Sequence, residues 1–184
     1  MDLKKLKNII SESYITEVGD LKNITPFDYL KKNNYHYVFN SNVGFIDVEI
    51  EDLSGFGDDI VFITQNQIYK QNYQGQPLYN ASFVVDGIDS QSAKTDLKEL
   101  NRIIKTVTLI IEEFIKNMKP FGVFVSGANR DSSKLEPDKV KNSLWLAIAT
   151  GANNNLSGYR IDRGELNYDG YSFDGFMIYK NKIK

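Results

Sequence analysis

The hydrophobic pattern of the chain begins as that of a helix. In residues 2–14, apolar side chains recur three or four positions apart, as they do on one face of an amphipathic helix. Residues 23–29 predict a second, short helical turn, which Thr25 can cap and Pro26 can begin. We therefore expect residues 1–34 to form an N-terminal helical segment.

From residue 35 the pattern changes to the period of two that is typical of β-strands. The expected strands, which form a meander, are 35–40, 45–53, 60–64 and 79–85. The first two form a hairpin, and a long polar loop precedes the fourth. In the second strand, Phe45, Asp47, Glu49 and Glu51 alternate with Ile46, Val48 and Ile50. One face of this strand is therefore expected to meet solvent and the other the core, with Phe45 as an exception.

Residues from about Ser90 to Met118 predict a long helix. Its apolar stripe is formed by positions 97, 100, 104, 107, 111, 114 and 118. Ile103, Ile110 and Ile115 widen the stripe, so we expect the helix to be buried on more than one side. Pro120 is expected to end it.

The last third of the chain predicts a strand, a helix and a closing hairpin. Residues 121–126 are apolar almost throughout, as in a strand that is covered on both faces. A helix is expected over 137–150 with Gly151 as its C-cap, and strands at 158–166 and 173–180 follow. The helix is expected to point Val140, Leu144, Ala147 and Ile148 inward.

This order of elements predicts one α+β domain over residues 35–184, with a mixed, mostly antiparallel sheet flanked by helices. The 184 residues carry a net charge of -2 and no cysteine, which argues against nucleic-acid binding and excludes thiolate chemistry. The N-terminus lacks the features of a signal peptide, and no apolar stretch is long enough to span a membrane. We expect a soluble, cytoplasmic protein.

The same order resembles that of the GCN5-related N-acetyltransferases. In that family, N-terminal helices and an antiparallel run of strands precede a helix, a central strand, a helix and two closing strands. Asn129, the pair Leu144-Trp145 and the pair Gly158-Tyr159 stand where members often carry Asn, Leu-Tyr and Gly-Phe. The resemblance implies an acetyltransferase-like fold, with a cofactor cleft near the turn after the central strand.

The chain also resembles an uncharacterised group of bacteriophage proteins, which have a long helix, a strand ending in Phe-x-Ser-Gly/Ala and a helix with Leu-Tyr. That resemblance implies a location in the host cytoplasm or in the virion.

In two places the sequence departs from the acetyltransferases. Members hold the pyrophosphate of acetyl-CoA on a glycine-rich loop at a helix N-terminus. The matching loop here, DGIDSQSAKTDL, has Gly87 as its one glycine and carries Asp86, Asp89 and Asp96, whose carboxylates repel a pyrophosphate. The tyrosine that often serves as general acid is replaced by Trp145. We therefore expect no cofactor, and we favour a protein that is not an enzyme.

Two groups of residues are candidate binding positions. Ser126, Asn129 and Arg130 follow the apolar strand and could converge on an anion or a polar ligand. The alternative is a strand end with an asparagine turn and a solvent-exposed arginine.

The second group lies at the closing hairpin. It comprises Tyr159, Arg160, Arg163 and Tyr171, and Trp145 of the preceding helix is a further candidate. Tyrosine and arginine are enriched in protein interfaces, which favours a protein partner or self-assembly. The alternative is a hairpin with aromatic cross-strand pairs.

The single histidine and an acidic cluster are weaker candidates. His36 could act as a general base, and the carboxylates of Asp47, Glu49, Glu51, Asp52, Asp58 and Asp59 could bind a divalent cation. A histidine in an aromatic patch and a solvated strand face are the alternatives that we favour. We therefore expect no metal site.

Three functional hypotheses follow from these observations. The first is a non-enzymatic, phage-type interaction or structural protein on an acetyltransferase-like fold. The second is an N-acetyltransferase with an atypical acetyl-CoA loop, and the third is a small-ligand or nucleotide-binding protein.

Overall fold

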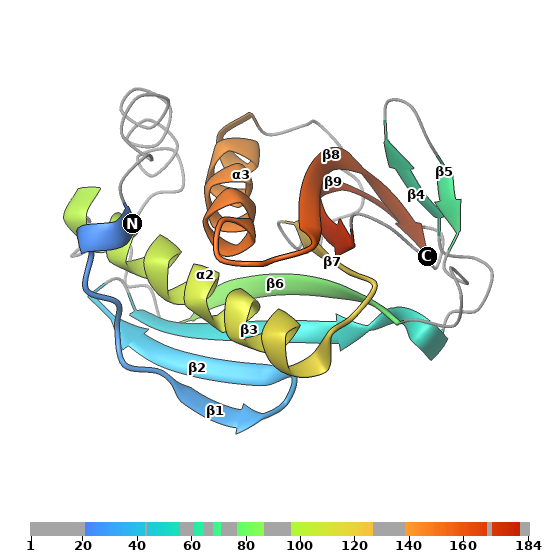
Figure 1. The fold of residues 1–184 in the computed structure, drawn as a ribbon. Helices are drawn as coiled ribbons and strands as arrows, with labels where there is room; N and C mark the ends of the chain where they lie inside the picture. The colour runs from blue at the N-terminus through green and yellow to red at the C-terminus, as the bar shows by residue number, and fades with distance from the viewer. Residues whose placement is uncertain are drawn as a thin grey trace.

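The structure, a computed structural model, describes residues 21–42, 44–55, 61–64, 68–70, 77–86, 97–126, 139–168 and 171–180. Within these residues, two α-helices accompany one nine-stranded sheet (Figure 1). This confirms the expected α+β class and the mixed, mostly antiparallel sheet. The elements are the 3-10 turn η1 (Leu21–Asn23), β1 (Leu30–Asn33), β2 (His36–Ser41), β3 (Gly44–Asp52), β4 (Val61–Thr64), β5 (Ile68–Lys70), β6 (Leu78–Asp86), α2 (Leu97–Met118), β7 (Gly122–Ser126), α3 (Lys139–Asn153), β8 (Tyr159–Tyr168) and β9 (Tyr171–Lys180).

The strands lie in the order β1-β2-β3-β6-β7-β9-β8-β4-β5. Every neighbouring pair is antiparallel except β6 and β7, which run parallel. A parallel pair needs a crossover connection, and here the segment that contains α2 supplies it. The strand expected at 121–126 therefore lies in the middle of the sheet.

The expected meander is wrong at its third strand. Strand β3 pairs directly with β6, whereas β4 pairs with β8 towards the other end of the sheet. Strand β5, which falls in the segment expected as a polar loop, pairs with β4 at the outer edge. The alternation of apolar residues predicts that a strand exists, but it carries no information about which strand is its partner.

The N-terminal segment also differs from the expectation. Leu21–Asn23 form a 3-10 turn, residues 24–29 have no regular secondary structure where a helical turn was expected, and Leu30–Asn33 form strand β1. All four residues of β1 are exposed, so no burial pattern marks them as a strand. Pairing with β2 makes β1 a strand, and the sheet therefore begins before residue 35. The helix expected over 2–14 lies outside the described residues.

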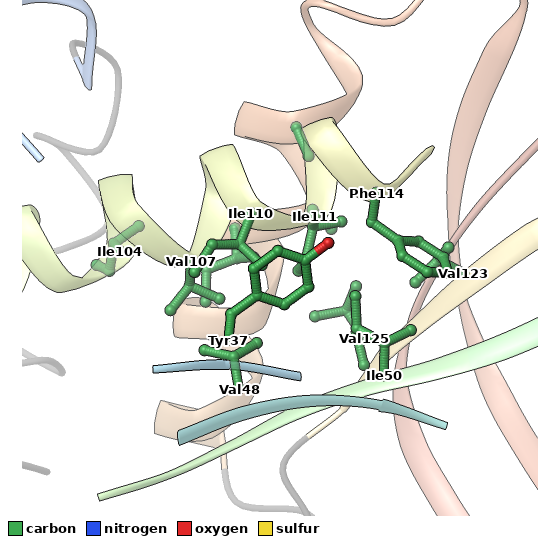
Figure 2. Close-up of a cluster of buried hydrophobic side chains, with 14 of the residues drawn as sticks. Tyr37, Val48, Ile50, Ile104, Val107, Ile110, Ile111, Phe114, Val123 and Val125 are labelled. Carbon is green, nitrogen blue, oxygen red and sulfur yellow. The ribbon is translucent and has the colours of Figure 1, made fainter. Parts of the chain in front are cut away.

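Both α-helices pack on the same face of the sheet, and they contact each other (Figure 1). The expected apolar stripe of α2 is confirmed over its described side chains, since the buried residues include Leu100, Ile104, Ile111 and Phe114. Figure 2 shows how this stripe meets the sheet. The side chains drawn there include Ile104, Val107, Ile110, Ile111 and Phe114 of α2, which face Tyr37, Val48, Ile50, Val123 and Val125 of the strands. Neither described helix has the length and hydropathy that crossing a membrane requires.

A second, smaller core lies on the other face of the sheet. Its buried residues are Leu53, Leu78, Phe121, Phe124, Leu166, Met177 and Tyr179. Strand β7 contributes to both cores, because Val123 and Val125 face the helices and Phe124 faces the other way. The prediction of a strand covered on both faces is thus confirmed.

Helix α3 runs on to Asn153, so Gly151 is not the C-cap that the sequence suggests. A Cβ atom on Gly151 would lie 2.9 Å from Cγ2 of Thr108 on α2. The missing side chain therefore allows α2 and α3 to approach closely. The predicted inward positions Ala147 and Ile148 are buried.

Candidate binding site where strands β6 and β7 separate

The parallel strands β6 and β7 pair over only four residues each. Their register runs from Leu78 opposite Gly122 to Ala81 opposite Val125. Beyond this point, β6 continues with β3 as far as Asp86, and Ser126 pairs with Gly175 of β9. The sheet therefore divides after Ala81 and Val125, and we call this place the fork.

Close packing holds β7 on the β9 side of the fork. A Cβ atom on Gly175 would collide with the carbonyl oxygen of Val125 and would lie 3.0 Å from Cζ of Phe124. Glycine at this position thus lets the ring of Phe124 and the backbone of β7 pack directly against β9. Strand β7 is therefore anchored to the half of the sheet that contains β8 and β9.

The fork has the geometry of a ligand position. In open sheets, ligands bind outside the carboxyl ends of parallel strands, where neighbouring connections lead away from each other. Among the described residues, no strand pairs with β6 on the β7 side beyond Ala81. This side of β6 is therefore where a ligand or a partner segment could approach the sheet.

The candidate residues around the fork are only partly described. Ser126 is the last residue of β7, which places it at the fork. Asn129 and Arg130 lie outside the described residues, so their convergence with Ser126 stays a prediction. Trp145 belongs to α3, and its side chain is not among those that the structure describes.

Tyr159 serves the packing of the fold. It is half-buried against the helix-side core, and its hydroxyl donates a hydrogen bond of 3.0 Å to the carbonyl oxygen of Pro120. Burial raises the pKa of Tyr159 to about 12. The phenol therefore stays neutral in the physiological range and ties the start of β8 to the end of α2.

Arg160 lies on the opposite face of β8, since side chains alternate along a strand. Its guanidinium stacks 4.5 Å from the ring centre of Tyr179, and its Nε atom lies 4.0 Å from Oδ2 of Asp162. The hydroxyl of Tyr179 donates a hydrogen bond to the same carboxylate. Arg160 is thus exposed on the face away from the helices, and Tyr179 and Asp162 hold its guanidinium in place.

The other hairpin candidates lie elsewhere. Arg163 pairs in register with Phe176, which belongs to the helix-side core, so Arg163 stands on the face opposite Arg160. Tyr171 pairs with Tyr168 at the turn end of the hairpin, far along the strands from Tyr159. The structure therefore does not gather Tyr159, Arg160 and Arg163 on one face of β8.

The sequence did not predict that His36 and nearby acidic residues lie together. His36 of β2 lies directly opposite Glu49 of β3, and its Nε2 atom contacts a carboxylate oxygen of Asp47. Its neighbour Tyr37 is buried on the helix side, so His36 faces acids on the other side of the sheet. The signal was present, because the turn between β2 and β3 sets which residues of the hairpin face each other.

Comparisons of the chain with protein-family models, with curated proteins and with solved structures found no match.

Proposed function

We propose that this protein is a non-enzymatic interaction protein, which uses an acetyltransferase-like sheet to bind a protein partner or a second copy of itself. Three antiparallel strands that neighbour one another in the sheet, β2, β3 and β6, precede α2, the central strand β7, α3 and the hairpin β8–β9, although β4 and β5 lie between β3 and β6 in the chain. The similarity of this arrangement to the order expected from the acetyltransferases supports the proposal. A location in a phage-infected host cell or in a virion belongs to the same proposal.

The observation that carries the proposal is the acidic connection that leads from the fork to α2. Strand β6 ends at Asp86, the connection carries Asp89 and Asp96, and α2 begins at Leu97 with Glu99 in its first turn. Backbone N–H groups at a helix N-terminus favour an anion, but carboxylates compete for those donors and repel a pyrophosphate. An acyl-CoA is therefore disfavoured at the fork.

A protein partner is a more favourable occupant of the fork than acyl-CoA. Among the described strands, none pairs with β6 on the β7 side beyond Ala81, and an extended segment added there would gain affinity from main-chain hydrogen bonds. A segment that carries lysine or arginine would complement the carboxylates of the connection.

An assay of CoA release tests the proposal. The protein is incubated with acetyl-CoA and a set of primary amines, and released CoA is measured with a thiol reagent. Because the chain has no cysteine, the reagent reports only CoA. We expect no release above that of a heat-denatured sample. Release that depends on folded protein and on the amine would overturn the proposal.

The solution mass then separates the two kinds of partner. A single chain has a mass of 21.0 kDa. Light scattering that gives a multiple of this mass at micromolar concentration supports a second copy as the partner. A mass of one chain directs the search to a different protein.

The parallel pair also favours a second candidate, an acetyltransferase with an atypical loop. A fork at the carboxyl ends of two parallel strands can receive an extended cofactor as well as a peptide. The same assay separates the two candidates, because only this one predicts CoA release.

A further inference from the structure

We infer that His36, Asp47 and Glu49 form a binding site for a divalent transition-metal ion, with Zn²⁺ as the probe of choice. The site lies on the face of the sheet away from α2 and is independent of the function proposed above. One ligand atom from each of the three residues can be chosen so that all lie within 4.8 Å of one another. Two ligands about 2.1 Å from a tetrahedral zinc ion are about 3.4 Å apart, so small side-chain rotations bring them into range.

The sheet preorganises this site. His36 and Glu49 are paired in register on β2 and β3, and Asp47, two residues before Glu49, lies on the same face of β3 because side chains alternate. Strand β3 is itself held by β6 on its other side. The three backbone positions are therefore fixed by the sheet before any ion binds, which reduces the cost of ordering the ligands.

The electrostatics favour a cation at this place. Two carboxylates face one imidazole, and among the described residues no lysine or arginine forms an ion pair with Asp47 or Glu49. Their mutual repulsion is relieved by a divalent ion that both coordinate.

Exposure and ligand type point to the kind of ion. The side chains of His36 and Asp47 are 26% and 30% exposed, and Glu49 is exposed, so an ion can enter and retain a water ligand. Imidazole with carboxylates suits Zn²⁺ and similar transition metals, whereas Mg²⁺ and Ca²⁺ prefer oxygen ligands throughout.

The chain has one histidine and no cysteine, so the imidazole signals belong to His36 and no thiolate competes for the ion. Tag-free protein is titrated with Zn²⁺ while the imidazole signals of His36 are followed by NMR, and the affinity is measured by calorimetry. We expect the imidazole signals to shift and to saturate at one ion per chain. We also expect binding of Mg²⁺ to leave these signals unchanged.

Variants assign the ligands. His36→Gln, Asp47→Asn and Glu49→Gln are each expected to weaken Zn²⁺ binding about tenfold or more. Glu51→Gln is the matched control, because it removes the same charge from the same face of β3 without removing a ligand. An unshifted imidazole in the presence of excess Zn²⁺ would overturn the inference. So would equal affinities for folded His36→Gln protein and wild type.

Discussion

At the scale of single residues, partly buried tyrosines tie distant segments to the core. Tyr29 donates a hydrogen bond of 2.6 Å to Glu113 of α2, and Tyr159 donates one to Pro120. Burial raises the pKa of Tyr37, Tyr79 and Tyr159 to about 12, and burial with the bond to Glu113 raises that of Tyr29 further. Since tyrosine in an unfolded chain titrates near pH ~10, the stability these groups contribute is complete below pH ~10 and is lost as the pH rises towards 12.

The variant Tyr159→Phe tests this alkaline dependence. Near neutral pH it is expected to be less stable than wild type by about 1 kcal/mol, because the hydrogen bond to Pro120 is lost. From pH 9 to pH 11 the difference should shrink, since only the wild type must keep a buried phenol protonated at this position. Urea unfolding at several pH values measures both free energies. A difference that stays constant across this range would contradict the raised pKa of Tyr159.

At the scale of elements, the sequence predicts those whose pattern is set by burial. Helix α2 and strand β7 are confirmed because their apolar residues lie in a core, and the alternation in β3 is confirmed for the same reason. Strand β1 could not be predicted because all of its residues are exposed. The pairing of β4 with β8 could not be predicted either, because the tertiary fold determines which strands pair.

The contact between β7 and β9 gives a test at this scale. Gly175→Ala is expected to destabilise the protein by about 1–3 kcal/mol, because the new Cβ meets the backbone of Val125, which is held in the centre of the sheet. Gly55→Ala is the matched control, since no atom lies within 4 Å of its added Cβ. The control is expected to change the free energy of unfolding by less than about 0.5 kcal/mol. Equal effects of the two substitutions in urea unfolding would refute the proposed packing of β7 on β9.

At the scale of the whole molecule, the sequence predicted the fold class better than it predicted the candidate site. The order of helices and strands along the chain follows from local patterns, whereas the fork depends on where β6 stops pairing with β7. The hairpin candidates were grouped because they are close in sequence, but Tyr159 and Arg160 stand on opposite faces of β8. His36 and Glu49 are distant in sequence and become neighbours through the register of β2 and β3.

The central proposal is that this protein binds a partner other than acyl-CoA. Thermal unfolding with and without millimolar acetyl-CoA tests it most directly. A ligand at about 100 times its dissociation constant stabilises a fold by about 2.7 kcal/mol, which raises the Tm of a domain of this size by several degrees. The account predicts an unchanged Tm, because the sequence from the end of β6 to α2 carries Asp86, Asp89 and Asp96, whose carboxylates repel a pyrophosphate. A rise of several degrees that saturates with acetyl-CoA would contradict it.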